Sequence, residues 1–196
     1  MPTNLEYALM AGRAYQTTRD TINWFPVPAG WNEFFHVPNN PAFTPSSSGF
    51  EAVSFRSGNG TGNEIVISYA GTDGLFSVDN FANFGLATGF GAAQLNDAAA
   101  YYLQVRQANP NAIITFTGHS LGGGLAALMG VFFGQRAVTF DQAPFANSAE
   151  LSLLHPDVAA NLKADLLARG YSEADLSGLT NFYNFGKPMA VFPIPI

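Results

Sequence analysis

The sequence contains no cysteine. This absence excludes disulfide bonds, thiolate metal sites and a cysteine nucleophile. Charged side chains are also scarce, because they make up 11% of the chain, and the net charge is −6. Nucleic-acid binding needs a basic patch, so it is not expected here. Long apolar runs are missing too, since none approaches the roughly 18 residues of a membrane span. The N-terminus lacks the basic start and apolar stretch of a cleavable secretion signal.

The residues that are present suit one domain with a sizeable core. The chain has 196 residues, of which 47% are hydrophobic, and phenylalanine alone occurs 18 times. This length fits a single domain over residues 1–196. The abundance of phenylalanine indicates an apolar cleft in addition to the core.

One short stretch carries the strongest signal. The β-branched run Ile113–Thr117 leads into Gly118-His-Ser-Leu-Gly122, and an alanine- and leucine-rich segment follows. Strand, sharp turn and helix with a serine at the tip form the pattern called the nucleophile elbow. Glycines two positions on either side of Ser120 are needed because strand and helix crowd each other there. The sequence therefore predicts that Ser120 is a nucleophile.

The rest of the chain alternates between strand and helix patterns. Helices are predicted over residues 3–16, 91–108, 121–134 and 147–169, the last broken at His155-Pro156, and strands over 50–56, 64–70, 113–117, 136–140 and 181–185. The segment 23–48, rich in proline and aromatic residues, excludes a central strand or helix, so a long loop that includes His36 is expected there. This order predicts an α/β fold with a mostly parallel sheet and helices on both faces. Thr72, Ser120 and Asp141 follow strand ends, so they should meet at one edge of the sheet.

A serine nucleophile imposes further requirements. A base must remove its proton, and an acid must orient that base. The tetrahedral intermediate needs donors aimed at its oxygen. We expect the backbone N–H of Leu121 to be one donor and Thr72, in the turn Gly71-Thr-Asp-Gly74, to be the other.

At these residues the chain resembles a known family. Ile65–Tyr69 followed by Ala70-Gly-Thr-Asp73, together with the elbow, is similar to the class 3 lipases of the α/β-hydrolase fold. The resemblance covers roughly residues 3–140 and includes the N-terminal helix near Tyr15. It also extends to the lipase-like N-terminal domain of large secreted bacterial proteins with RTX repeats, although no such repeats are present. The resemblance implies lipid ester hydrolysis, a Ser-Asp-His triad in that order, and a lid over Phe76–Phe90.

The acid and the base are less clearly marked than the nucleophile. Of the three histidines, His119 adjoins the nucleophile and should point away, His36 lies far upstream, and only His155 follows both Ser120 and Asp141. One interpretation is a Ser120–Asp141–His155 triad. A second is that the chain is the front part of a longer lipase whose acid or base lies beyond residue 196. A third is a catalytically incomplete domain that binds lipid or a partner.

The sequence thus predicts a serine ester hydrolase, lipase-like, acting on apolar acyl esters with transient contact to a lipid surface. Asp73, Asp79 and Asn80 lack the spacing of a calcium loop, so neither a metal nor a cofactor is expected. The resemblance implies a secreted bacterial protein without a cleavable signal, and a cytoplasmic location stays open.

Overall fold

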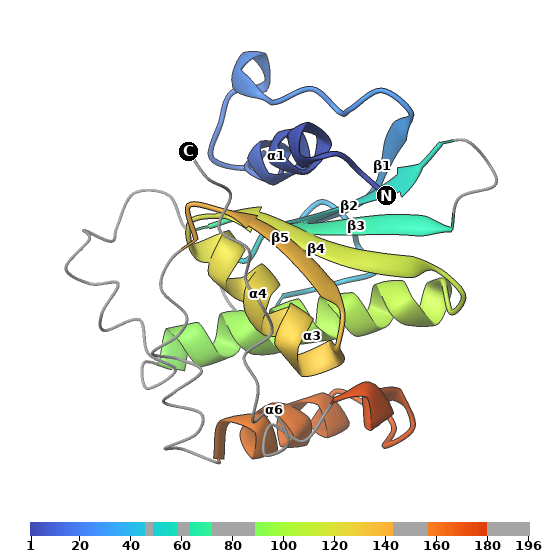
Figure 1. Cartoon of the computed structure of the whole chain (residues 1–196). Coiled ribbons are helices and arrows are strands. Elements are labelled where there is room, and N and C mark those ends of the chain that lie inside the picture. The colour runs from blue at the N-terminus through green and yellow to red at the C-terminus, as the bar shows by residue number, and fades with distance from the viewer. Residues whose placement is uncertain (46–48, 59–62, 72–88, 143–156, 180–196) are drawn as a thin grey trace.

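A computed structural model describes residues 1–45, 49–58, 63–71, 89–142 and 157–179. The helices and strands follow one another in the order shown in Figure 1. They are α1 (Asn4–Arg13), the 3₁₀-helix η1 (Thr21–Asn23), β1 (Trp31–Val37), β2 (Ala52–Ser57), β3 (Glu64–Tyr69), α3 (Gly89–Ala108), β4 (Ile113–His119), α4 (Leu121–Phe133), β5 (Arg136–Phe140), α6 (Asp157–Ala168) and the 3₁₀-helix η2 (Asp175–Gly178).

The five strands form one mixed sheet in the order β1-β2-β3-β4-β5. β3, β4 and β5 are parallel, whereas β1 pairs with β2, and β2 with β3, in antiparallel fashion. The predicted α/β class is therefore confirmed, and the hairpin of β2 and β3 accounts for part of the antiparallel half. Tyr69, Gly118 and Thr139 are in register across the parallel strands, so their carboxyl ends meet at one edge of the sheet.

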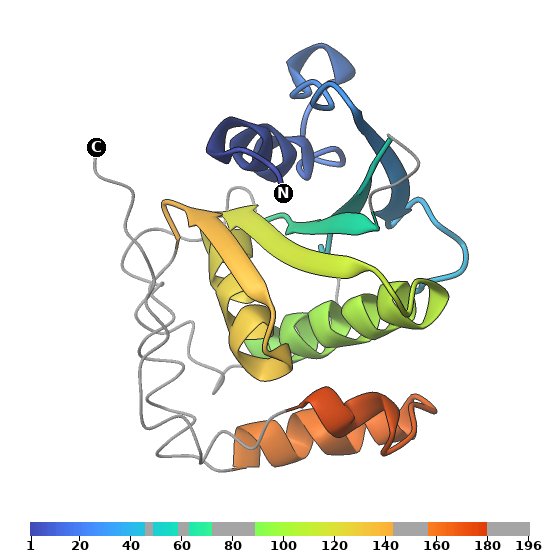
Figure 2. The ribbon, with the colours of Figure 1, turned by 45° about the vertical axis from the view of Figure 1, so that its right-hand side comes forward.

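Helices cover both faces of the sheet, as predicted. α1 packs on one face, where Tyr7, Met10 and Val66 belong to one apolar cluster. α3 and α4 pack on the other face, and α6 forms a further layer against α3 (Figures 1 and 2). Every residue of α4 is apolar or glycine, which agrees with its position in the core, since 12 of its residues are buried.

The N-terminal helix begins with the capping box that its sequence predicts. The Thr3 hydroxyl accepts a hydrogen bond from the Glu6 N–H at 3.3 Å, and the Thr3 N–H donates to the Glu6 carboxylate at 2.6 Å. These bonds satisfy free donors at the helix start. The helix ends at Arg13, three residues earlier than predicted, so Tyr15 lies in the turn that follows it.

The proline-rich segment differs from the expectation of a long loop, because it contains strand β1. Pro28 and Pro38 flank this strand, and Trp31–Val37 itself has no proline. As an edge strand β1 pairs on one side only, so neighbouring prolines are compatible with it. The predicted strand 181–185 and the first part of the predicted helix 147–169 lie outside the described residues.

Candidate active site

Ser120 is the single residue between β4 and α4, as the elbow pattern predicts. Its backbone has φ 56° and ψ −125°, a left-handed conformation that L residues rarely adopt. Its N–H donates to the Phe140 carbonyl at 3.1 Å, and its carbonyl accepts from the Gly124 N–H at 3.1 Å. The side chain is half-buried and makes no capping hydrogen bond with the helix. The hydroxyl lies next to a helix N-terminus, where developing negative charge is favoured.

The glycines around Ser120 are required by close backbone approach. A Cβ at Gly118 would lie 2.8 Å from the Gly123 nitrogen, and one at Gly122 would lie 2.7 Å from the carbonyl carbon of Tyr69. Both distances are shorter than real Cβ atoms show, and backbone atoms cannot rotate away. The strand and helix therefore meet at the serine only because these two positions carry no side chain.

The end of β3 lies directly against this turn. A Cβ at Gly71 would be 3.4 Å from the Gly122 nitrogen and 3.4 Å from the His119 carbonyl oxygen. Leu121 is the first residue of α4, so its N–H is one of the free donors at the helix start. Its side chain is buried. Thr72, the second predicted oxyanion donor, lies outside the described residues, one position after Gly71.

Tyr69 fixes the strand end that precedes this loop. Its hydroxyl donates to the Ala98 carbonyl in α3 at 3.0 Å. Complete burial raises the pKa of Tyr69 well above its usual value, and the neighbouring Tyr101 and Tyr102 add to the effect. The phenol therefore stays a neutral donor near neutral pH, and the bond to α3 persists.

Of the predicted acid and base, the structure describes only the acid. Asp141 directly follows β5, has φ 41° and carries an exposed side chain. Its backbone is adjacent to the elbow, because the Phe140 carbonyl accepts the Ser120 N–H. The turn at Ser120 and the end of β5 therefore meet at one edge of the sheet, as predicted for residues that follow strand ends. His155 lies outside the described residues.

Tyr15 belongs to the site but was not assigned to it from the sequence. Its hydroxyl donates to the His119 carbonyl at 3.0 Å and lies 3.4 Å from the His119 Nδ1. The same hydroxyl oxygen is the atom that a Cβ at Gly71 would meet, at 2.8 Å. Tyr15 is 3% exposed, so it holds the residue before the nucleophile from inside the fold. It therefore joins the turn after α1 to the elbow and to the loop after β3.

The neighbouring residues of that turn are held by a buried carboxylate. One oxygen of Glu51 accepts the N–H groups of Gln16 and Thr17, both at 2.9 Å, and lies 3.0 Å from the His36 Nε2. The other oxygen accepts the Thr17 hydroxyl at 2.7 Å. Glu51 and His36 are 4% and 9% exposed, so the carboxylate is satisfied by these partners rather than by water. His36 thus has a structural role.

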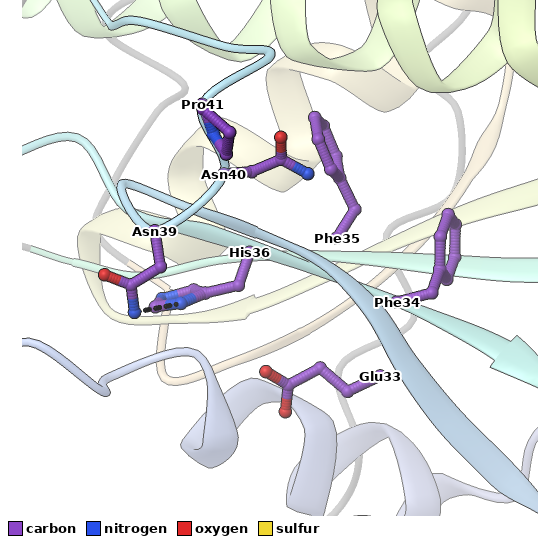
Figure 3. A pocket seen from close by; sticks show the side chains of 7 residues that line it. All are labelled: Glu33, Phe34, Phe35, His36, Asn39, Asn40 and Pro41. Carbon is purple, nitrogen blue, oxygen red and sulfur yellow. Dashed lines mark hydrogen bonds between the residues drawn. The ribbon is translucent and has the colours of Figure 1, made fainter.

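A surface hollow of about 330 Å³ lies along β1 and the turn after it (Figure 3). Its lining residues are Glu33, Phe34, Phe35, His36, Asn39, Asn40 and Pro41. In Figure 3 the Asn39 amide points to the His36 ring, and the two nitrogens are 2.9 Å apart. The hollow lies three strands away from β4 in the sheet order and includes none of the predicted site residues.

Among the described residues, no group of three His, Cys, Asp or Glu side chains is arranged to hold a metal ion. Asp73, Asp79 and Asn80 lie outside those residues. Nor does the described part of the chain contain a helix with the length and apolar character needed to cross a bilayer.

Lipases and phospholipases are among the proteins that this chain resembles. Residues 6–167 match the profile of the Tle-like phospholipase domain. An extracellular phospholipase A1 from Serratia liquefaciens is 36% identical over 131 residues, which cover 65% of this chain and 38% of that protein. A putative lipase, ATG15, from Cryptococcus neoformans var. neoformans is 33% identical over 90 residues, or 46% of this chain and 15% of that protein.

A solved lipase structure from Rhizopus microsporus var. chinensis also matches. It has a TM-score of 0.38 and 18% identity, with coverage of 70% of this chain and 55% of that one. The chain thus spans well under two thirds of the length of these proteins.

Proposed function

Since the chain belongs to the Tle-like phospholipase family of lipase-like hydrolases, we propose that it cleaves acyl esters of lipids through an acyl-enzyme on Ser120. The observation that carries this proposal is the backbone of Ser120, held at φ 56° between β4 and α4. A strained conformation at an accessible serine is typical of a functional site. Its side chain caps no donor of α4, so the helix start does not account for a serine at this position.

The proposed reaction proceeds in two steps. The Ser120 hydroxyl loses its proton to a base and attacks the ester carbonyl, which forms a tetrahedral intermediate. The N–H of Leu121 and a donor from Thr72 stabilise its oxyanion, since Gly71 already lies against the elbow. The alcohol then leaves with the proton, and water releases the fatty acid from the acyl-enzyme. For the base and its partner we propose His155 and Asp141.

The relatives support a proposal for the substrate class. One of them is named as an extracellular phospholipase A1, so we propose a phospholipid acyl ester as the substrate and a site of action outside the producing cell. A series of esters with increasing acyl length tests the apolar part of this proposal. Higher kcat/KM for long than for two-carbon acyl groups is expected, and the reverse preference contradicts it.

A fluorophosphonate probe tests the nucleophile. Such probes react with activated serines and form a stable phosphonate ester. We expect one label per folded chain, located on the peptide that contains Ser120, and no label on the Ser120→Ala variant. A matched control is Ser54→Ala, which changes a buried serine of β2 and should leave the label in place. A folded wild-type chain without label instead supports a non-catalytic lipid-binding domain.

Tyr15 offers a second test, as a positioning residue. Tyr15→Phe removes the donor to the His119 carbonyl. Loss of this bond destabilises the fold by about 1 kcal/mol and loosens the elbow, so kcat/KM should fall about 5- to 10-fold. Tyr171→Phe is the control, because its hydroxyl also donates to a backbone carbonyl, that of Ala100 at 2.8 Å, between α3 and the segment after α6.

The two variants separate positioning from general stability. Both should lower the melting temperature by similar amounts, but only Tyr15→Phe should lower kcat, measured well below the melting transition. Equal rates for the two variants mean that Tyr15 has a purely structural role.

A further inference from the structure

The turn after α1 carries an exposed apolar tip. Ile22, in η1, is 89% exposed, and Phe25 is 41% exposed. In Figures 1 and 2, η1 protrudes beyond α1, on the side of α1 that faces away from the sheet. Single exposed apolar residues are common on protein surfaces. Ile22 and Phe25 place two exposed apolar side chains within four positions of this protruding turn.

The turn is held in place rather than loosely attached. The Trp24 indole N–H donates to the Arg19 carbonyl at 2.9 Å, and the Arg13 guanidinium donates to the Phe25 carbonyl at 3.2 Å. Arg13 also lies 4.5 Å above the Trp24 ring. These contacts present Ile22 to solvent in a fixed position. Little conformational entropy is therefore lost if this tip binds to something.

The same turn is connected to the proposed nucleophile. The Arg19 guanidinium lies 4.6 Å from the centre of the Tyr15 ring and 5.9 Å from that of Phe25. The Tyr15 hydroxyl in turn binds the carbonyl of His119, the residue before Ser120. The turn that carries Ile22 is thus joined to the elbow by two successive side-chain contacts, Arg19 on Tyr15 and Tyr15 on His119.

The charges around the tip favour an uncharged surface. Arg13 is paired with Glu33 at 3.0 Å, and Arg19 is adjacent to Asp20 in sequence. The patch therefore has no net charge, and the whole chain carries −6. An anionic membrane would repel this chain, whereas insertion of Ile22 among lipid tails requires no charge.

We propose that residues 19–25 dock on the surface of a zwitterionic phospholipid bilayer, with Ile22 inserted, and so bring Ser120 to its substrate. The benefit to catalysis rests on the proposed function, but the docking itself does not require hydrolysis. Binding should depend weakly on salt, because apolar insertion rather than charge attraction drives it.

The opposite edge of the molecule supplies a matched control. Ile113, the first residue of β4, is 60% exposed and lies at the other end of the strand from Ser120. General adsorption of apolar side chains would involve Ile113 as readily as Ile22. A docking surface formed by residues 19–25 involves Ile22 and not Ile113.

The absence of cysteine makes a site-specific probe simple. Ile22→Cys and Ile113→Cys, each in the Ser120→Ala background so that no lipid is consumed, are labelled with a polarity-sensitive fluorophore. With phosphatidylcholine vesicles we expect a blue shift and a several-fold rise in emission at position 22, and no change at position 113. In co-sedimentation, Ile22→Ser should weaken vesicle binding about 10-fold, and Ile113→Ser should leave it unchanged.

Three results would overturn the docking proposal: no vesicle binding, equal fluorescence changes at both positions, or binding that 0.5 M salt abolishes. Failure of the proposed hydrolase is distinguishable from all of these. In that case the wild-type chain binds vesicles through position 22, yet the fluorophosphonate probe leaves Ser120 unlabelled.

Discussion

Replacing Ser120 by glycine is expected to abolish hydrolysis and at the same time to stabilise the fold. Without the hydroxyl no acyl-enzyme forms, so kcat/KM should fall by about 100,000-fold. The backbone at φ 56° and ψ −125° is one that glycine adopts without strain, whereas a side chain there costs of order 1–3 kcal/mol. Glycine loses about 0.5–1 kcal/mol through the greater freedom of the unfolded chain. The net gain should be about 1 kcal/mol.

Comparison with Ser120→Ala separates the effect of backbone strain from the effect of losing the hydroxyl. Alanine removes the same hydroxyl but keeps the Cβ, so it should be equally inactive and less stable than the glycine variant. Urea unfolding of the wild type, Ser120→Ala and Ser120→Gly gives the order of their free energies of unfolding. Ala126→Gly is a useful contrast, because it introduces glycine at an ordinary, buried position of α4 and should destabilise by 1 kcal/mol or more. A Ser120→Gly variant less stable than Ser120→Ala would show that the elbow stores no strain.

Local patterns in the sequence were sufficient to predict the elbow. The two glycines, the apolar strand before Ser120 and the alanine- and leucine-rich helix after it each follow from contacts within a few residues. β5 was predicted at residues 136–140, which are its bounds in the structure. Parallel strands align their carboxyl ends, so the position of Asp141 beside the Phe140–Ser120 hydrogen bond follows from the same reasoning.

Contacts between distant segments could not be predicted from local patterns in the sequence. Tyr15 reaches His119 across 104 positions of the chain, and Glu51 binds Thr17 across 34. An ordinary helical stripe explains Tyr15 equally well, and a lone glutamate before a strand predicts no partner. His36 was assigned to an aromatic loop because prolines surround it. Those prolines flank an edge strand instead, and the histidine is buried against Glu51.

The proposed base and acid should produce the second-largest effect on activity. His155→Gln keeps a polar side chain of similar length but cannot accept the Ser120 proton, so kcat/KM should fall about 1,000- to 10,000-fold. Asp141→Asn should cost a similar factor, because a carboxylate both orients the imidazole and stabilises its cation. His36→Gln is the matched control. It alters the buried contact with Glu51, so it should lower the melting temperature and leave kcat/KM within a few-fold of wild type.

A double variant distinguishes one catalytic unit from separate contributions. Residues of a triad act together, so Ser120→Ala combined with His155→Gln should be no slower than Ser120→Ala alone. In the wild type, kcat/KM should fall with decreasing pH as the base becomes protonated, since an imidazolium cannot accept a proton. If His155→Gln retains both the wild-type rate and this acid limb, another group is the base. Asp141, with its exposed carboxylate, would then be a turn residue, and the base would have to be sought elsewhere, including beyond residue 196.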